Sequence, residues 1–84
     1  MAKHAIQIKI KLFYDFAHYL PRGSQKKQAV ITTAEGTTVS QLFDHLGLPS
    51  QTPKTILVNG VKAYLATPLH NHDSIAVFPP MAGG

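Results

Sequence analysis

Hydrophobic and polar residues alternate strictly near the start of the chain. Isoleucine or leucine stands at every second position from 6 to 12, and Gln7, Lys9 and Lys11 fill the positions between them. A period of two with β-branched residues predicts a strand that is buried on one face over residues 6–12. A second short strand is expected over residues 28–33.

The segment between these two strands shows no clear period. Residues 13–20 are rich in aromatic side chains, and residues 22–27 are polar and indicate an exposed turn. We expect Phe13 and Phe16 to close one end of the core. The two tyrosines of the segment are expected to keep their hydroxyls in water.

A short amphipathic helix is the clearest element of the sequence. Thr38 is expected to be its N-cap, and Gln41 follows three residues later, where a capping box requires it. Gly47 is a suitable left-handed stop at the C-terminal end. The apolar residues fall at i, i+3, i+4 and i+7 and share one face: Val39, Leu42, Phe43 and Leu46. A helix of about ten residues needs that face packed against a sheet.

A hairpin and a last strand follow the helix. Residues 55–58 predict a strand, Asn59 and Gly60 a two-residue turn, and residues 61–65 the returning strand. Residues 75–78 alternate again and predict the final strand. The order strand, strand, helix, hairpin, strand predicts an α+β fold with one helix packed across one mixed sheet.

Composition narrows the classes of function. The 84 residues leave room for one domain, and 44% hydrophobic with 14% charged residues indicates a globular chain. The absence of cysteine excludes a disulfide framework, a thiolate nucleophile and a cysteine zinc site. The net charge of +4 favours acidic partners, but no aromatic residues interleave with the lysines, so nucleic acid is not the expected partner. No apolar run suits a membrane span or a signal peptide, and we expect a cytoplasmic protein without a membrane partner.

The end of the chain cannot belong to the sheet. The last six residues, 79–84, begin with two prolines, which remove consecutive backbone donors, and end with two glycines, which carry no side chain. A stiff stem with a narrow tip suits a terminus that enters another protein's active site; the alternative is an ordinary frayed end. The expected organisation is a domain over residues 1–78 and a flexible tail over residues 79–84.

Taken together, these residues resemble the MoaD/ThiS family of ubiquitin-like sulfur carriers, and most closely its MoaD branch, the small subunit of molybdopterin synthase. The resemblance covers essentially the whole chain. It rests on the order and spacing of four features of the sequence: Gly36-Thr37-Thr38-Val39, Val58-Asn59-Gly60, Asp73 and Phe78-Pro79-Pro80-Met81-Ala82-Gly83-Gly84. It implies a β-grasp fold, in which the last strand lies beside the first and the helix crosses a mixed sheet of four or five strands.

The resemblance also implies a mechanism. A ubiquitin-activating-type enzyme would adenylate the Gly84 carboxylate with ATP, and a sulfur donor protein would supply the sulfur of a thiocarboxylate. That group would pass sulfur to a precursor of molybdopterin or of the tungsten cofactor, with the large subunit of molybdopterin synthase as a further partner. The chain would be a carrier or small subunit without a bound cofactor, a metal or an independent active site. Gly84 would react, and the tail and partner-binding residues would be Phe78, Pro79, Pro80, Met81, Ala82 and Gly83.

Three other functions remain open. A protein modifier would use the same activated terminus to form isopeptide bonds with lysines. A related sulfur carrier would serve the thiazole of thiamin or another sulfur-containing metabolite. A binding module with a ubiquitin-like surface would use no terminal chemistry at all.

The turn before the last strand departs from the family. The family often has Asp-Gly-Asp there, whereas this chain has Asn71, His72 and Asp73. Asn71 tolerates the left-handed conformation, so the turn is expected to survive the loss of its glycine. His70 and His72 are spaced as metal ligands sometimes are, but the expected role of both is in a solvated turn.

Overall fold

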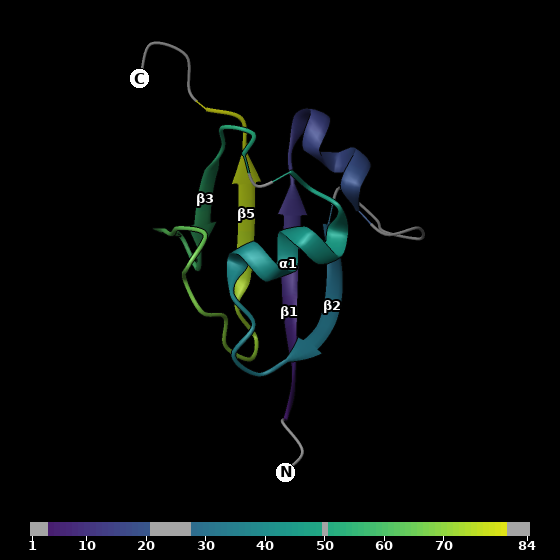
Figure 1. Cartoon of the computed structure of the whole chain (residues 1–84), viewed down its shortest axis with the longest axis vertical. Helices are drawn as coiled ribbons and strands as arrows, with labels where there is room; N and C mark the ends of the chain where they lie inside the picture. Colours follow the sequence, from purple (N-terminus) through teal and green to yellow (C-terminus); the bar gives the residue numbers. More distant parts are fainter. Residues whose placement is uncertain (1–3, 21–27, 50, 81–84) are drawn as a thin grey trace.

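The computed structural model describes residues 4–20, 28–49 and 51–80, apart from the side chain of Asp15. The turn expected over residues 22–27 therefore lies outside the described residues. Within the described part, no helix is long and apolar enough to cross a membrane. A single five-stranded sheet has the order β2-β1-β5-β3-β4 (Figure 1). Its strands are β1 (Ala5–Leu12), β2 (Gln28–Ala34), β3 (Thr55–Val58), β4 (Val61–Lys62) and β5 (Ser74–Phe78).

The first strand, β1, is the centre of the sheet. Its residues alternate between exposed and buried along its whole length, which confirms the strand predicted from the period of two. It pairs antiparallel with β2, where Ile8 lies opposite Ile31, and parallel with β5, where Ile10 lies opposite Ile75. The last strand therefore lies beside the first, as the β-grasp fold requires.

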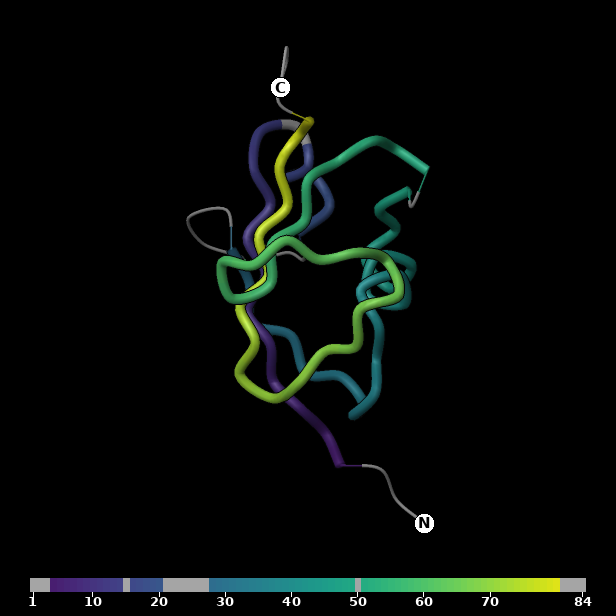
Figure 2. Tube along the Cα trace, turned by 90° about the vertical axis from the view of Figure 1, so that its left-hand side faces the viewer, coloured from purple at the N-terminus to yellow at the C-terminus, as the bar shows by residue number. Residues whose placement is uncertain are grey.

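The single α-helix, α1 (Val39–Leu46), covers one face of the sheet (Figures 1 and 2). The predicted capping box is present: the Gln41 N–H donates to the Thr38 hydroxyl at 3.2 Å, and the Gln41 side-chain oxygen accepts from the Thr38 N–H at 3.0 Å. Gly47 ends the helix with a φ of 80°, the predicted left-handed stop. The helix buries its apolar stripe against the inward isoleucines, with Val39, Leu42 and Phe43 fully inside.

The aromatic segment that had no sequence period forms a 3₁₀-helix, η1 (Tyr14–Tyr19). Phe16 is buried in the core as predicted, and Tyr14 is 73% exposed. The prediction for Phe13 was wrong: Phe13 is only partly covered, does not pack against the buried core, and stacks on Phe78 instead. Three residues per turn do not produce the α-helical or strand periods, which explains why the hydrophobic pattern gave no assignment here.

The predicted returning strand over residues 61–65 is too long. Pairing in β4 covers only Val61 and Lys62, although the Ala63 N–H still donates to the Ile56 carbonyl at 2.8 Å. The chain then turns, because the Thr67 hydroxyl accepts from the Tyr64 N–H at 3.0 Å. Because Ala63 and Ile56 form a hydrogen-bonded pair, the Tyr64 N–H faces away from β3, and the local turn that it makes with Thr67 ends the strand early.

The left-handed residue in the turn before β5 is His72 and not Asn71. His72 has a φ of 70°, at the position where the family often has glycine. Asn71 contributes its side chain instead, whose oxygen accepts from the Gln7 N–H at 2.8 Å, while the His72 N–H donates to the Gln7 carbonyl at 2.7 Å. These two bonds to β1 hold the turn in place, so the turn keeps its shape without glycine.

Replacement of His72 by glycine is expected to stabilise the protein. The exposed imidazole of His72 sits on a strained left-handed backbone, and its removal gains about 0.5 kcal/mol after the higher chain entropy of glycine is subtracted. We expect the melting temperature of His72→Gly to rise by about 2–4 °C in a thermal denaturation monitored by circular dichroism.

The matched control is Asn59→Gly, which also removes a left-handed side chain, at a φ of 54°. Unlike His72, Asn59 uses its side chain in two hydrogen bonds, to Asp73 and to the Ser74 N–H. Asn59→Gly is therefore expected to lower the melting temperature. If His72→Gly lowers it as well, backbone strain is not what limits the stability of this turn.

Candidate functional site at the root of the C-terminal tail

The last described residues of the chain, Phe78, Pro79 and Pro80, form what we call the tail root. They leave the sheet at the end of β5, beside the end of β1, as Figure 1 shows at the top of the sheet. The rings of Phe13 and Phe78 stack, with centroids 4.5 Å apart and planes inclined by 9°. The Phe13 N–H donates to the Val77 carbonyl at 3.1 Å, so the stack rests on a paired backbone. The direction in which the tail leaves the body is thereby defined by β1 and β5 together.

A shallow groove runs beside the tail root. Its volume is about 430 Å³, and its lining comes from η1, from the loop before β3 and from the two prolines: Phe16, His18, Tyr19, Thr52, Pro53, Pro79 and Pro80. The groove therefore places an apolar, partly open wall next to the segment that carries the end of the chain. A partner that receives the tail has this wall available for contact.

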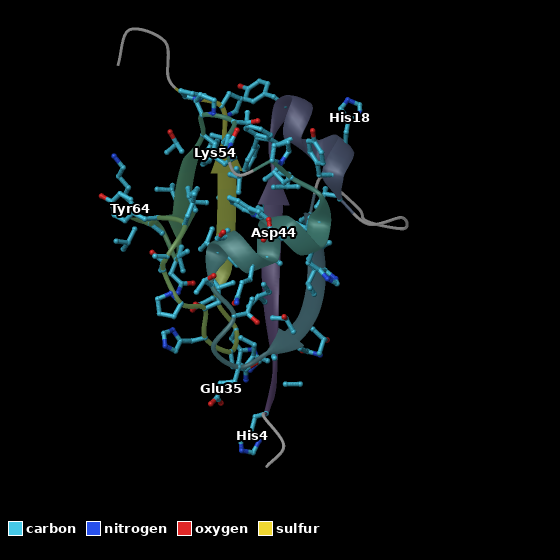
Figure 3. The ribbon with its side chains drawn as sticks, viewed as in Figure 1. His4, His18, Glu35, Asp44, Lys54 and Tyr64 are labelled. Carbon is cyan, nitrogen blue, oxygen red and sulfur yellow. The ribbon has the colours of Figure 1, made fainter. Side chains whose placement is uncertain are left out.

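The loop before β3 is held in place by Lys54. The Lys54 ammonium donates to the Pro49 carbonyl at 2.8 Å and to the Thr52 carbonyl, and lies 5.4 Å from the centre of the Phe43 ring. Burial lowers the pKa of Lys54 from its ordinary value, because it disfavours the charged form. Figure 3 shows Lys54 toward the tail-root end of the sheet. This lysine thus ties one wall of the groove to the helix core.

The described side chains around the tail root carry little acid–base chemistry. Of the residues that line the groove, His18 and Tyr19 are the ones that can exchange a proton, and His18 is exposed. Across the described residues, no group of three or more histidine, cysteine or acidic side chains is placed to hold a metal ion. Of the predicted site residues, Phe78, Pro79 and Pro80 come together here, and Met81, Ala82, Gly83 and Gly84 lie outside the described residues.

Two residues that carry the family resemblance, Asn59 and Asp73, lie at the opposite end of the sheet from the tail root. The Asp73 carboxylate, in a residue only 8% exposed, accepts from the Asn59 side-chain amide and from the His70 N–H, both at 2.8 Å. The Asn59 side-chain oxygen in turn accepts from the Ser74 N–H at 2.9 Å. These bonds join the β3–β4 hairpin to the start of β5. Their role is in the fold, and the sequence motif did not distinguish that role from a functional one.

Removal of the Asp73 carboxylate is expected to destabilise the protein strongly. Asp73→Ala leaves the Asn59 amide and the His70 N–H without their acceptor, which costs about 2–3 kcal/mol for hydrogen bonds to a charged group. Chemical denaturation would measure this loss. The control Glu35→Ala removes an exposed carboxylate and is expected to change the unfolding free energy by about 0.5 kcal/mol or less. Equal effects of the two variants would contradict a structural role for Asp73.

The face of the sheet opposite α1 carries lysines around an apolar centre. One register row crosses four strands in the order Lys11, Ala76, Leu57, Lys62. Lys9 lies on the same face of β1 two residues before Lys11, and alternation places Phe13 and Phe78 there too. We call this the outer face. The outer face is continuous with the tail root. The sequence analysis did not predict it, because hydrophobic periodicity identifies only the buried side of each strand.

The fold and the tail root define the class of the protein. One helix on a five-stranded mixed sheet, with the last strand parallel to the first and leading out of the body, is the β-grasp fold of ubiquitin-like proteins. The chain belongs to the ThiS family: the family model matches residues 19–84. It is thus a member of the ubiquitin-like sulfur carriers and modifiers of the ThiS/MoaD type, and carriers of this type work with partner enzymes.

Three of the solved structures that are similar to this chain are described below. SAMP1 from Haloferax volcanii is 26% identical, with a TM-score of 0.67 over 93% of this chain and 99% of that one. The HVO 2177 protein of the same organism is 24% identical, with a TM-score of 0.73 over 95% and 88%. A Pyrococcus furiosus protein described as subunit 1 of molybdopterin converting factor is 21% identical, with a TM-score of 0.69 over 90% and 99%. The comparison with curated protein sequences found no significant match.

Proposed function

We propose that the chain is a sulfur carrier that reacts through the carboxylate of Gly84. The observation that carries this proposal is the Phe78-Pro79-Pro80-Met81-Ala82-Gly83-Gly84 segment at the end of a ThiS-family chain, with its root leaving the sheet beside β1. The stacked Phe13 and Phe78 rings support a stem with a defined direction. Two terminal glycines allow close approach of a partner's reacting groups, because no Cβ stands in the way.

The chemistry follows from the low reactivity of a carboxylate. The terminal carboxylate attacks the α-phosphorus of ATP in the partner's active site and releases pyrophosphate, which leaves an acyl-adenylate. Hydrosulfide supplied by a donor protein then displaces AMP and leaves a thiocarboxylate. The thiocarboxylate sulfur bonds to the acceptor, and water cleaves the acyl–sulfur bond, which leaves the sulfur on the acceptor and restores the Gly84 carboxylate. The carrier contributes position, because each step needs the terminus in near-attack geometry. The partner enzymes contribute the acids, bases and phosphate-binding groups.

We assign the acceptor to the molybdopterin or tungsten-cofactor precursor, with the large subunit of molybdopterin synthase as the receiving partner. The Pro79-Pro80 stem, which resembles the MoaD branch more than the thiazole branch, supports this choice. The chain acts in the cytoplasm, where ATP is available for activation of the Gly84 carboxylate. Docking would use the outer face together with Phe78, and the lysines of that face favour a partner surface with acidic residues around an apolar patch.

The test is the intact mass of the chain isolated quickly from its own cells, with and without Gly84. A fraction heavier by one exchange of oxygen for sulfur, present in the full chain and missing from the truncated one, is the expected result. A thiol-alkylating reagent is expected to raise the mass of that fraction further, because it reacts with the thiocarboxylate sulfur. The unmodified chain has no cysteine, so its mass is expected to stay unchanged. A heavier fraction that persists in the truncated chain would contradict the proposal.

A second candidate function is protein modification through the same terminus. The structural similarity to SAMP1, a small archaeal modifier protein at 26% identity, favours it. Modification predicts adducts in which the Gly84 carboxyl is bonded to lysine amines of other proteins. Denaturing immunoblots of cell extracts would show these adducts as a ladder that is lost when Gly84 is removed. A sulfur carrier without modifier activity would give a single band.

A further inference from the structure

The turn between β3 and β4 consists of Asn59 and Gly60, and both residues are exposed. An asparagine that precedes a glycine is a labile pair, because the glycine nitrogen can attack the side-chain amide carbon with no Cβ in the way. The space beside the Gly60 Cα is open, since a Cβ placed there would meet no atom within 4 Å. The chain has one other asparagine, Asn71, and the bulkier His72 follows it. Of the two asparagines, Asn59 therefore has the higher intrinsic reactivity toward its own backbone.

In the folded chain, Asn59 is fixed to the start of β5 by three hydrogen bonds. Its backbone N–H donates to the Ser74 carbonyl at 2.7 Å, and its side-chain oxygen accepts from the Ser74 N–H at 2.9 Å. Its side-chain NH₂ group donates to the Asp73 carboxylate at 2.8 Å. Attack by the Gly60 nitrogen needs the amide carbon turned toward the next peptide bond. That rotation breaks both side-chain hydrogen bonds, so the folded turn protects the amide.

The hairpin that carries this turn has a short ladder. The strand β4 contributes two paired residues, Val61 and Lys62, and Val61 is 69% exposed. Elements with short ladders and little buried surface open locally more often than a whole domain unfolds. The turn is therefore expected to detach from β5 transiently, and each detachment releases the Asn59 side chain.

We propose that Asn59 is a deamidation site, protected while Asp73 and Ser74 hold its side chain and reactive when the turn detaches. In the first step, the Gly60 nitrogen bonds to the Asn59 side-chain carbon and loses its proton. The side-chain nitrogen leaves as ammonia, so a cyclic imide remains. Water then opens the imide at one of its two carbonyls. The product is aspartate, or isoaspartate in which the main chain runs through the former side chain.

Conversion keeps the turn detached from β5. Aspartate at position 59 has an oxygen where the amide nitrogen donated, so a second carboxylate would face Asp73, which lies 2.8 Å from that nitrogen and is only 8% exposed. Like charges at this separation repel. Isoaspartate adds one atom to the main chain of a two-residue turn, whose geometry depends on loop length. Deamidation thus marks irreversibly each chain whose turn has opened. The site lies at the opposite end of the sheet from the tail root, so this inference does not depend on the chemistry of Gly84.

The first test compares the rate of Asn59 conversion in the folded chain with the rate in a capped peptide of residues 56–62, at the same neutral pH and temperature. Peptide mapping by mass spectrometry measures conversion. We expect Asn59 to convert about tenfold or more slowly in the folded chain, because opening and closing are fast compared with the chemistry and the rate follows the open fraction. Equal rates in the folded chain and the peptide would overturn the proposal.

Asn71 is the internal control for the intrinsic reactivity. In the chain unfolded by urea, Asn59 is expected to convert at the rate of the peptide in the same urea concentration, and about tenfold or more faster than Asn71, because His72 obstructs attack there. Conversion of Asn71 as fast as that of Asn59 in the unfolded chain would also overturn the assignment.

Asp73→Ala tests which contact protects the amide. Removal of the carboxylate releases the Asn59 NH₂ group, and we expect conversion to be about threefold or more faster than in the wild type, in chains that circular dichroism shows to be folded. Leu42→Ala is the matched control, because it truncates a buried side chain of α1, away from the turn, at a similar cost in stability. It is expected to leave the rate close to that of the wild type. Equal acceleration by both variants would show that global unfolding sets the rate and would overturn the proposal.

Asn59→Asp tests the product and does not depend on the folding of Asp73→Ala. Its matched control is Asn59→Gly, which loses the same side-chain bond to Asp73 without adding a charge. We expect Asn59→Asp to have the lower melting temperature of the two, although its new carboxylate still offers an acceptor to the Ser74 N–H. A melting temperature of Asn59→Asp at or above that of Asn59→Gly would mean that the turn re-forms after conversion, and the proposal would fail.

Discussion

Removal of Gly84 is expected to abolish ATP-dependent activation of the chain while leaving its folding unchanged. Deletion of one residue withdraws the terminal carboxylate by about 3.5 Å along an extended chain. Reacting atoms must approach to about 3–3.5 Å, so the shortened terminus no longer reaches the α-phosphorus of ATP, and we expect a loss of about a thousandfold or more. Adenylation of the terminal carboxylate can be measured directly, as exchange of radioactive pyrophosphate into ATP catalysed by a ubiquitin-activating-type enzyme.

Two controls separate reach from folding. The strands, α1 and the buried core all lie before residue 79, so the melting temperature of the truncated chain is expected to match that of the full chain. Gly84→Ala keeps the length of the tail and adds one methyl group, and we expect it to retain more activity than the deletion. A truncated chain that supports full pyrophosphate exchange would place the reacting group elsewhere in the protein.

Replacement of Phe43 by alanine is expected to have the largest effect on stability. Phe43 has no exposed surface, lies on the inner face of α1 and carries the Lys54 ammonium above its ring. Loss of a buried phenyl ring costs about 3–5 kcal/mol, through lost burial and the cavity that remains. A domain of this size has a total stability of only about 4–13 kcal/mol. We expect the melting temperature to fall by at least about 12 °C, or the protein to be unfolded at ambient temperature.

Tyr64→Ala is the matched control for this change. Tyr64 is also aromatic but is 63% exposed and lies in the turn after β4, so its removal is expected to change the unfolding free energy by about 0.5 kcal/mol or less. Circular dichroism melts of both variants give the comparison. Similar losses for Tyr64→Ala and Phe43→Ala would show that burial on the α1 face does not dominate the stability of this fold.

The elements that could be predicted are those whose signals are local. The strand β1 follows from a period of two, and α1 follows from its apolar stripe together with the Thr38–Gln41 capping box. Asn59 and Gly60 form the predicted turn because both occupy the left-handed region, with φ values of 54° and 82°. In each case the residues that specify the conformation lie within a few positions of one another. Pairing of β1 with β5 was expected only from the family resemblance.

The elements that were missed either have a weak local signal or depend on contacts between distant residues. A local turn, in which the Tyr64 N–H bonds to the Thr67 hydroxyl, makes the returning strand shorter than its apolar residues suggest. His72 takes the left-handed conformation because Asn71 and His72 are both bonded to Gln7, far away in the sequence. Residues 13–20 form a 3₁₀-helix that has no hydrophobic period of its own.

The candidate site likewise has features that could be predicted from the sequence and features that could not. The tail residues could be named from the sequence, because a terminal Phe-Pro-Pro segment and a Gly-Gly end are properties of consecutive residues. The stack of Phe13 on Phe78, the groove beside the prolines and the Lys11–Lys62 row each join residues from different strands. No spacing in a single segment reports them.

By itself, the sequence determined the amphipathic strands and helix and the chemical character of the terminus, since backbone preferences and side-chain periods act over a few residues. The tertiary structure alone decided where the tail leaves the body, which lysines share the outer face, and that Asn59 and Asp73 act in folding. Those features depend on which strands become neighbours, and burial of the core decides that for the whole chain at once.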